Sequence, residues 1–476
     1  MEIFKYSGPS FDLYGEEWSD SLILDDGPWP APMADGPLDA YVAVPGSKSI
    51  TNRELVLSAL ADSPSTLRRP LHARDTTLMI DALKALGTEI EELADSDSPF
   101  GPDLRVTPAE ELEGGVSIEC GLAGTVMRFV PPVAALALGP VNFDGDEAAR
   151  KRPMLGVLEG LEQLGVEVRD DGKRRLPFSM YGTGEVAGGE LEIDASASSQ
   201  FVSGLLLTAP RFTTGLTLRH VGDAVPSLPH INMTIACLRA RGVEVTTPEP
   251  NVWRVEPGPI AGAEIAIEPD LSNAAPFLLA SVITGGAVCV PDWPADSTQL
   301  GDLLVDLLQR LGADVELHDG MLMCNVSPET VAESFEYDFA DAGGELVPNI
   351  AAVCAFLPGV SRLTGIGHLR GHETDRVAAL AAELGRIGVP VVEGDDSLEI
   401  TGGAELHGEL WRCYEDHRMA TAGALVGLAV EGITLDDVQC TSKTLPQFVQ
   451  LWNAMLTGSA PTPDDEPPTS FISLTL

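Results

Sequence analysis

Basic side chains stand beside small and hydroxyl residues at several places in this acidic chain. In VPGSKSITNR, Lys48 and Arg53 follow Gly46 at the expected start of a helix. Backbone N–H groups at a helix start, hydroxyls and two cations can together bind a phosphate or a carboxylate. The GxxxxGK[ST] pattern of a nucleotide-binding loop is absent. We interpret the segment as an anion cradle, with an ordinary helix start as the alternative.

The segment CGLAGTVMRF combines small and basic residues in a similar way. Gly124 can let a ligand approach the backbone, and Thr125 and Arg128 can donate hydrogen bonds to an anion. Three cations at positions 150–152 follow at the start of another expected helix. A Gly-rich turn with solvated charges is the alternative, but such a cationic run is unusual in a chain of this charge.

Polar groups also precede apolar helices in two later regions. In ASASSQF, residues 198–200 stand before an apolar run, where helix capping alone could explain the serines. In the final third, GIGHLRGHETDR, CYEDHRMA and CTSKTLP each place charged groups directly before an apolar run. Helix starts that face one cleft would bring these groups together. They are Arg370, His372, Glu373, Asp375, Arg376, Asp416, His417, Arg418 and Lys443.

Motifs for metals and for other common chemistries are missing. No pair of His, Cys, Asp or Glu has the spacing of a zinc site, so we expect no metal. Neither GxSxG nor GxGxxG in a βαβ context is present. The cationic segments therefore remain the strongest indication of function.

Composition limits the possible partners and the compartment. The formal net charge is −43, which repels nucleic-acid backbones and anionic membranes. Seven dispersed cysteines indicate reduced thiols. The longest uncharged apolar stretch, 272–291, is interrupted by two glycines, and no secretory signal is visible. We expect a cytoplasmic protein that binds neither nucleic acid nor membrane.

An amphipathic helix that ends in glycine and leads into an alternating strand recurs five times. Such a pattern predicts a left-handed glycine at each helix end. With a sixth apolar helix at 445–456, the repeats predict two α/β domains of three modules each. The repeats lie at 75–93, 152–168, 226–245, 297–317 and 373–393, with terminal glycines at 87, 165, 242, 312 and 388.

A Pro- and Gly-rich stretch around 250–270 suggests where the chain crosses between the two domains. We expect an extension over 1–37 and a flexible, Pro-rich acidic tail over 457–476. The first domain is expected to span 46–267, and the second to combine 38–45 with 268–456.

Seven motifs together identify the chain as similar to the 5-enolpyruvylshikimate-3-phosphate synthases. PGSKSITNR, GLAGTVMRF, KRPM, SSQF, HETDR, DHRMA and SKTLP occur in that family's order and spacing, over roughly residues 39–456. The resemblance implies the two-domain enolpyruvyl transferase fold, an inside-out α/β barrel in which each domain has three βαβαββ modules. A double crossover is expected to join the domains.

The resemblance also implies which residues bind the two substrates and which act on them. The catalytic residues are expected to be Lys48, Glu345 and Glu373. Shikimate 3-phosphate is expected on Lys48, Ser49, Arg53, Ser198, Ser199, Gln200, Ser227, Glu345 and His372. Phosphoenolpyruvate is expected on Lys48, Gly124, Thr125, Arg128, Arg152, Gln200, Arg376, Arg418 and Lys443.

Three positions depart from the commoner family pattern. Leu122 stands where many relatives have Asn, and His372 where many have Lys. Asn349 replaces an Asp that serves as base, and an amide cannot accept the proton of the substrate hydroxyl. Glu345 is our candidate for the replacement, with Asp341 as a weaker one.

The resemblance implies transfer of the enolpyruvyl group to the 5-hydroxyl of shikimate 3-phosphate, with release of phosphate, by a monomer without metal or organic cofactor. It also implies sensitivity to glyphosate, because glycine at position 124 leaves room for that inhibitor. One alternative is the UDP-N-acetylglucosamine enolpyruvyl transferase, which typically uses a loop cysteine. A non-catalytic binding protein that lost its base is the other.

Overall fold

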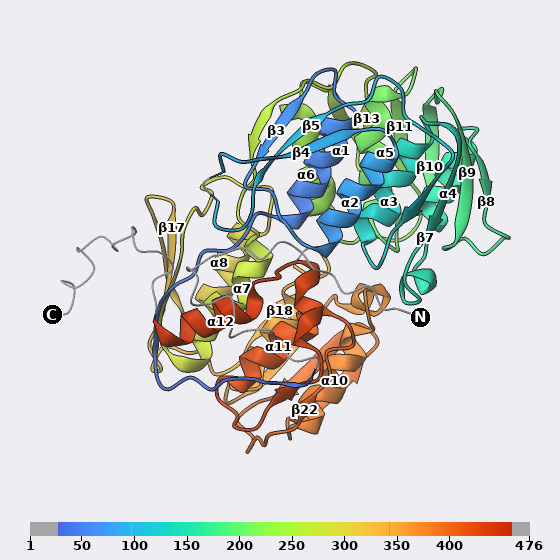
Figure 1. Cartoon of the computed structure of the whole chain (residues 1–476). Coiled ribbons are helices and arrows are strands. Elements are labelled where there is room, and N and C mark those ends of the chain that lie inside the picture. Colours follow the sequence, from blue (N-terminus) through green and yellow to red (C-terminus); the bar gives the residue numbers. More distant parts are fainter. Residues whose placement is uncertain (1–26, 97, 342, 459–476) are drawn as a thin grey trace.

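The chain folds into two lobes, coloured blue to green and yellow to red in Figure 1. The structure, a computed structural model, describes residues 27–96, 98–341 and 343–458. The expected tail from residue 459 onward, and the expected extension up to residue 26, lie outside these ranges. None of the helices within them has both the length and the hydropathy needed to cross a membrane.

Each lobe has its own hydrophobic core. The first core lies between Ile50 and Ile267. The second core uses residues 29–44 and 271–455, together with Phe100 from the first lobe. Two separate cores support our proposal that the lobes are the two domains with the boundaries expected from the sequence.

The first lobe repeats one βαβαββ unit. In the unit that starts at β6, the strand order is β6-β7-β9-β8, with one parallel and two antiparallel pairs. The next unit has the matching order β10-β11-β13-β12. Helices α3 and α5 are buried on every side apart from one residue, so the sheets lie outside the helices. The elements are α1 (Lys48–Ala59), β3 (Ser65–Arg68), α2 (Arg74–Ala85), β4 (Glu89–Leu93), β5 (Asp103–Thr107), β6 (Val116–Glu119), α3 (Gly124–Ala134), β7 (Leu138–Asp144), η1 (Ala149–Lys151), α4 (Leu155–Gln163), β8 (Glu167–Arg169), β9 (Phe178–Thr183), β10 (Gly189–Ile193), α5 (Ser199–Thr208), η2 (Ala209–Arg211), β11 (Leu216–His220), α6 (Leu228–Ala240), β12 (Val245–Glu249), β13 (Val252–Val255) and β14 (Glu264–Ala266).

The remaining unit of this lobe, which comes first in the sequence, takes one of its strands from the end of the lobe's sequence. Strand β14 pairs in parallel with β3, which gives the order β14-β3-β5-β4. The two chain crossings therefore run side by side, and Gly46 forms an antiparallel bridge with Pro269. A Cβ at position 46 would lie 2.3 Å from the carbonyl oxygen of Arg69, so only glycine fits this close approach.

The second lobe follows the same plan. Strand β2 supplies the first strand of the order β2-β15-β17-β16, and the next unit has the order β18-β19-β21-β20. The elements are β1 (Trp29–Pro30), β2 (Leu38–Tyr41), α7 (Leu271–Thr284), β15 (Gly286–Val290), α8 (Gly301–Arg310), β16 (Asp314–His318), β17 (Met321–Val326), β18 (Glu336–Asp338), α9 (Val347–Cys354), β19 (Val360–Thr364), η3 (Gly367–Gly371), α10 (Arg376–Arg386), β20 (Val391–Gly394), β21 (Ser397–Thr401), β22 (Leu410–Trp411), α11 (His417–Gly427), β23 (Thr434–Leu435), η4 (Val438–Lys443) and α12 (Phe448–Thr457).

The last unit is completed by a strand from the start of the described chain. Strand β1 pairs antiparallel with β23, where the other units place a strand that follows their second helix. Trp29 is buried against Phe448 of α12, with ring centroids 6.4 Å apart. Our expectation that all of residues 1–37 stand outside the repeat is therefore wrong for Trp29 and Pro30, because the free edge of β23 takes them as its antiparallel partner.

The expected helix ends are confirmed. Each of the five recurring glycines has a positive φ, between 82° and 101°, just beyond a helix. A side chain would be strained in this conformation, which makes glycine the natural stop. Each stretch then continues into a short strand, as the alternation predicts.

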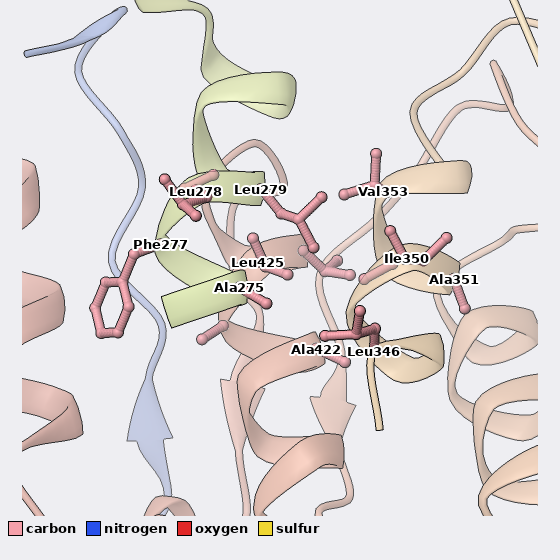
Figure 2. Packing of buried hydrophobic residues seen from close by; sticks show 14 of the residues in the cluster. Ala275, Phe277, Leu278, Leu279, Leu346, Ile350, Ala351, Val353, Ala422 and Leu425 are labelled. Carbon is pink, nitrogen blue, oxygen red and sulfur yellow. The ribbon is translucent and has the colours of Figure 1, made fainter. Parts of the chain in front are cut away.

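The core of the second lobe is built from closely packed helices that begin near the cleft. Figure 2 shows Leu279, Ile350 and Leu425 of α7, α9 and α11 meeting in this core. Small residues let the elements approach closely: a Cβ at Gly423 would lie 2.6 Å from the ring of Trp411. This packing fixes the starts of the helices, where the polar residues of the cleft lie.

Candidate active site

A polar cleft between the lobes is lined mainly by the first residues of helices. Lys48 and Gly124 open α1 and α3, Ser198 and Ser227 are the N-caps of α5 and α6, and Asp270 is the N-cap of α7. Helix N-termini present unpaired N–H groups and partial positive charge. The cleft therefore favours anions even in a chain with a large negative charge.

The expected binding and catalytic residues gather in this one cleft, with a single exception. Lys443 does not line it directly, but its Nζ lies 2.7 Å from Oε1 of Glu373, which does. The lining includes Lys48, Ser49, Arg53, Gly124, Thr125, Arg128, Arg152, Ser198, Ser199, Gln200, Ser227, Glu345, His372, Glu373, Arg376 and Arg418.

Some basic and acidic residues singled out by their pattern lie elsewhere. Arg150 is exposed and paired with Asp144 at 2.7 Å, so only the third cation of its run reaches the cleft. Arg370 pairs with Asp375 at 2.9 Å, and Asp375 caps α10 by accepting from the N–H of Ala378. These residues neutralise surface charge or cap a helix.

Arg53 organises the first-lobe wall of the cleft. Its guanidinium is buried and donates to Oγ1 of Thr234 at 2.8 Å and to the carbonyls of Ser49 and His230 at 2.8 and 2.9 Å. Burial lowers the pKa of Arg53 to about 10. The side chain thus ties the first turn of α1 to α6 and fixes two helix starts at the cleft.

Arg128 and Arg152 form a cationic pair, and neither has an ion pair with a carboxylate among the described residues. Arg128 donates to the carbonyl of Pro153 at 2.9 Å, and Arg152 to the carbonyl of Leu122 at 3.2 Å. Burial, followed by the charge of Arg152, lowers the pKa of Arg128 well below its usual value. Their buried Nε atoms have no hydrogen-bond partner. Two adjacent guanidinium groups without an ion-pair partner among the described residues suit the binding of an anion.

Gly124 lies against this pair. A Cβ there would come within 3.0 Å of Oε1 of Gln200 and 3.1 Å of a terminal nitrogen of Arg152. Its φ is not positive, unlike that of Gly121, so the turn itself does not require glycine at position 124. The absent side chain leaves space directly beside the cations.

Lys48 stands where the lobes meet. Its backbone N–H donates to Oδ2 of Asp270 in the second lobe at 3.0 Å, and its Nζ lies 3.7 Å from Oδ2 of Asp75. Burial lowers the pKa of Lys48, with Asp75 opposing the shift and Lys443 adding to it. A lysine with a lowered pKa gives up its proton more readily than an exposed one.

Two cations of the second-lobe wall, Arg376 and Lys443, already have acidic partners. Arg376 donates to Asp416 at 2.7 Å and to Glu373 at 2.9 Å, and Lys443 bonds the other oxygen of Glu373. Although burial opposes ionisation of Glu373, Lys443 and Arg376 hold its pKa well below the usual value. This network is charged and buried, and it is complete without a ligand.

Arg418 and two histidines complete the second-lobe wall. Arg418 donates to the hydroxyl and the carbonyl of Ser272 at 2.6 and 2.7 Å, and burial lowers its pKa. Burial and the charge of Arg376 lower the pKa of His372 to about 3, and burial and Arg418 lower that of His417 strongly. Both imidazoles are therefore neutral at physiological pH.

Comparison with known proteins identifies the family. The family model for EPSP synthase (3-phosphoshikimate 1-carboxyvinyltransferase) matches residues 33–452. A 3-phosphoshikimate 1-carboxyvinyltransferase of Kocuria rhizophila is 54% identical over 436 residues, which cover 90% of this chain and 97% of that protein. The chain belongs to the EPSP synthase family. It is an enzyme that transfers the enolpyruvyl group of phosphoenolpyruvate to shikimate 3-phosphate.

Solved structures share the fold of this EPSP synthase family member. EPSP synthase from Acinetobacter baumannii has a TM-score of 0.71 and 21% identity, covering 90% of this chain and 98% of that one. The enolpyruvyl transferase NikO from Streptomyces tendae has a TM-score of 0.70 and 16% identity, with coverage of 90% and 97%. The expected two-domain enolpyruvyl transferase fold is confirmed. The curated match decides against the alternatives of a UDP-N-acetylglucosamine transferase and of a binding protein.

The departures from the EPSP synthase pattern have clear structural outcomes. Asn349 is fully buried on α9, and its Oδ1 accepts from Oγ1 of Thr421 on α11 at 2.9 Å, so it does not line the cleft. Glu345, just before α9, does line it, whereas Asp341 is exposed and does not. The side chain of Leu122 is buried in the first core, and only its carbonyl serves the site.

Sequence reasoning missed several residues that line the cleft. The N-cap signal of an Asp before an apolar run could have indicated Asp270. The others follow no local signal, because they reach the cleft through the packing of separate units. The missed residues are Asp75, His230, Asp270, Ser272, His368 and Thr444.

Proposed function

We propose that Glu345 is the base of the enolpyruvyl transfer and that the two walls of the cleft divide the substrates between them. The observation that carries this proposal is that the amide of Asn349 is buried away from the cleft, whereas the carboxylate of Glu345 lines it. Asn349 is sequestered on Thr421, while Glu345 lines the cleft opposite the first-lobe helix starts. An amide cannot act as a base, so the carboxylate one turn earlier takes that role.

Shikimate 3-phosphate is held mainly by the first lobe in this proposal. Hydroxyl and N–H donors at the starts of α5 and α6 suit a phosphate dianion, and Arg53 keeps the α1 and α6 starts together. Because a bound phosphate adds negative charge near Glu345, it raises the pKa of that carboxylate and makes it a stronger base. The residues assigned to this substrate are Lys48, Ser49, Arg53, Ser198, Ser199, Gln200, Ser227, Glu345 and His372.

Phosphoenolpyruvate lies between the walls. Its phosphate and carboxylate need several cations, which the unpaired Arg128–Arg152 pair supplies from one side and Arg376, Arg418 and Lys443 supply from the other. Gly124, Thr125 and Gln200 border the same space. Bringing two anions together is unfavourable in water, and fixed cations remove that obstacle.

The reaction proceeds by addition and elimination. Glu345 takes the proton of the 5-hydroxyl as its oxygen bonds to C2 of phosphoenolpyruvate, and the Lys48 ammonium gives a proton to the methylene carbon. In the elimination, Lys48 takes a proton back from the methyl group, the C2–O bond to phosphate breaks, and protonated Glu345 returns its proton to the leaving phosphate. Glu373 keeps Arg376 and Lys443 in place and stabilises the charge of Lys48.

Phosphate release from the two substrates tests the base assignment. We expect Glu345→Gln to lose about 10²- to 10⁴-fold in kcat, the usual contribution of a general base, while shikimate 3-phosphate still binds by calorimetry. Asp341→Asn is the matched control, since Asp341 is an exposed carboxylate four residues earlier, and it should keep wild-type activity. Activity of Glu345→Gln within a few-fold of wild type would transfer the role to Glu373.

The same proposal places the enzyme in the cytoplasm as a monomer that acts on two small molecules, without nucleic acid or membrane. Every group assigned above comes from one chain, so the cleft needs no second copy. Sedimentation at the concentration of the assay would show a larger species if a second copy were required.

A further inference from the structure

One ion pair in the cleft joins side chains of different lobes. Nε2 of His230, on α6 of the first lobe, lies 3.5 Å from Oε1 of Glu345, just before α9 of the second lobe. Every other ion pair between cleft-lining side chains of the described residues stays within one lobe. The contact therefore depends on how the two lobes sit together.

The backbone of His230 is held firmly behind the imidazole. Ser227, the N-cap of α6, has a left-handed conformation (φ 55°), and its carbonyl accepts from the N–H of His230 at 3.0 Å. The carbonyl of His230 accepts from Arg53 at 2.9 Å and from Oγ1 of Thr234 at 3.0 Å. The imidazole thus extends into the cleft from a fixed point, with 27% of the side chain exposed.

Glu345 has charged and titratable neighbours on four elements, and one of them lies within ion-pair distance. Its negative charge interacts with the positive charges of Arg376 on α10 and Arg418 on α11. The same charge acts on His368 in η3. His230 on α6 is the one within ion-pair distance among the described residues. Burial opposes the ionisation of Glu345, but the neighbouring His230, together with the charge of Arg418, lowers its pKa to about 2.

We propose that His230 is a positioning residue for the base. Its Nε2–H donates to Oε1 of Glu345 and leaves Oε2 to face the hydroxyl of shikimate 3-phosphate. His230 takes no part in the proton transfer, and the substrate proton passes only to Glu345. Because the donor and the carboxylate belong to different lobes, the base is correctly oriented only when the cleft is closed. This inference rests on the proposed role of Glu345.

Two variants of His230, one that keeps an N–H donor and one that lacks it, separate the positioning role from a merely structural one. We expect His230→Ala to lower kcat about 10²-fold, the effect of a misplaced reacting group, with KM for phosphoenolpyruvate nearly unchanged. His230→Gln keeps an N–H donor and should recover most of that loss. His318→Ala is the control, because His318 is an exposed histidine of strand β16 and should behave as wild type.

A double variant shows whether His230 acts through Glu345. If it does, adding His230→Ala to Glu345→Gln causes no further loss of kcat, since the group to be positioned is gone. Independent, multiplying losses would overturn the inference, as would a change confined to KM for shikimate 3-phosphate. If His230→Ala is fully active and Glu345→Gln is inactive, the positioning role of His230 is wrong but the base assignment stands. If Glu345→Gln is fully active, both the base assignment and the positioning role are wrong.

Discussion

Two pairs of cations, one on each wall of the cleft, differ in whether they have acidic partners. On the first-lobe wall, Arg128 and Arg152 bond to backbone carbonyls, and Arg128 also bonds to the thioether sulfur of Met127, but neither has an ion pair with an acidic residue among the described residues. On the second-lobe wall, Arg376 and Lys443 are bound by Asp416 and Glu373. Both pairs are cationic, but only Arg376 and Lys443 are neutralised by ion pairs before any substrate arrives.

The difference indicates a division of labour between affinity and geometry. A buried guanidinium without a counterion is costly, and a substrate anion removes that cost when it binds. A completed network gains less charge neutralisation from a ligand, but it holds its members in fixed positions. We therefore expect the first-lobe wall to supply binding energy at the expense of stability. The second-lobe wall should support both stability and activity.

Arg128→Met should separate the two properties most strongly. Removal of an unpaired cation from the anion site should lower kcat/KM for phosphoenolpyruvate about 10²- to 10³-fold, as for loss of one charge-stabilising donor. The temperature of unfolding should stay equal or rise, because a buried charge without an acidic partner is lost. Arg150→Met, at an exposed and paired arginine nearby, is the control. A large drop in stability would contradict the comparison.

Arg376→Met should show the opposite behaviour on the other wall. It leaves Asp416 and Glu373 buried with fewer partners, and breaking a buried pair in this way costs about 3–5 kcal/mol of unfolding free energy. Activity should fall as well. Urea unfolding measures the change, and Arg310→Met, at an exposed pair on α8, should be nearly neutral. Wild-type stability would mean that the network is not structural.

Gly124→Ala sharpens the account of the first-lobe wall without changing its charge. The added methyl would meet Gln200 and Arg152 at 3.0 and 3.1 Å. One methyl in a tight pocket is worth about 10- to 200-fold in binding, so the inhibition constant of glyphosate should rise by that factor. KM for phosphoenolpyruvate should rise less, and stability should be kept because φ is ordinary here. Equal inhibition constants would remove Gly124 from the pocket.

His372→Gln tests the charge of the second-lobe wall by pH. The pKa of His372 is lowered to about 3, so below the unfolded value of about 6.5 the unfolded chain binds a proton that the folded chain does not. The stability of the wild type should therefore fall more steeply with acid than that of the variant once the pH drops below about 6.5. His407→Gln, at an exposed site, should keep the wild-type slope. Parallel curves for His372→Gln and wild type would contradict the lowered pKa of His372.

Many of the residues that line the cleft could be predicted because they stand in short local motifs. Gly124 and Arg128 stand in one short segment, and Glu373 and Arg376 in another, so each group's helix start was visible in the sequence. The sequence showed less clearly that Glu345, and not Asn349, lines the cleft. Asn349 is held away from the cleft by Thr421 on another helix, a contact between residues 72 positions apart.

The sequence by itself determined the repeating units, the glycine helix ends and the positions of the cations, because hydrophobic periodicity and capping act within a few residues. Only the tertiary structure decided which groups meet. It placed Trp29 and Pro30 in the sheet of β23, and His230 opposite Glu345. Such pairings join segments more than a hundred residues apart. They depend on which surfaces remain unpaired once the units have packed, and no local pattern records that.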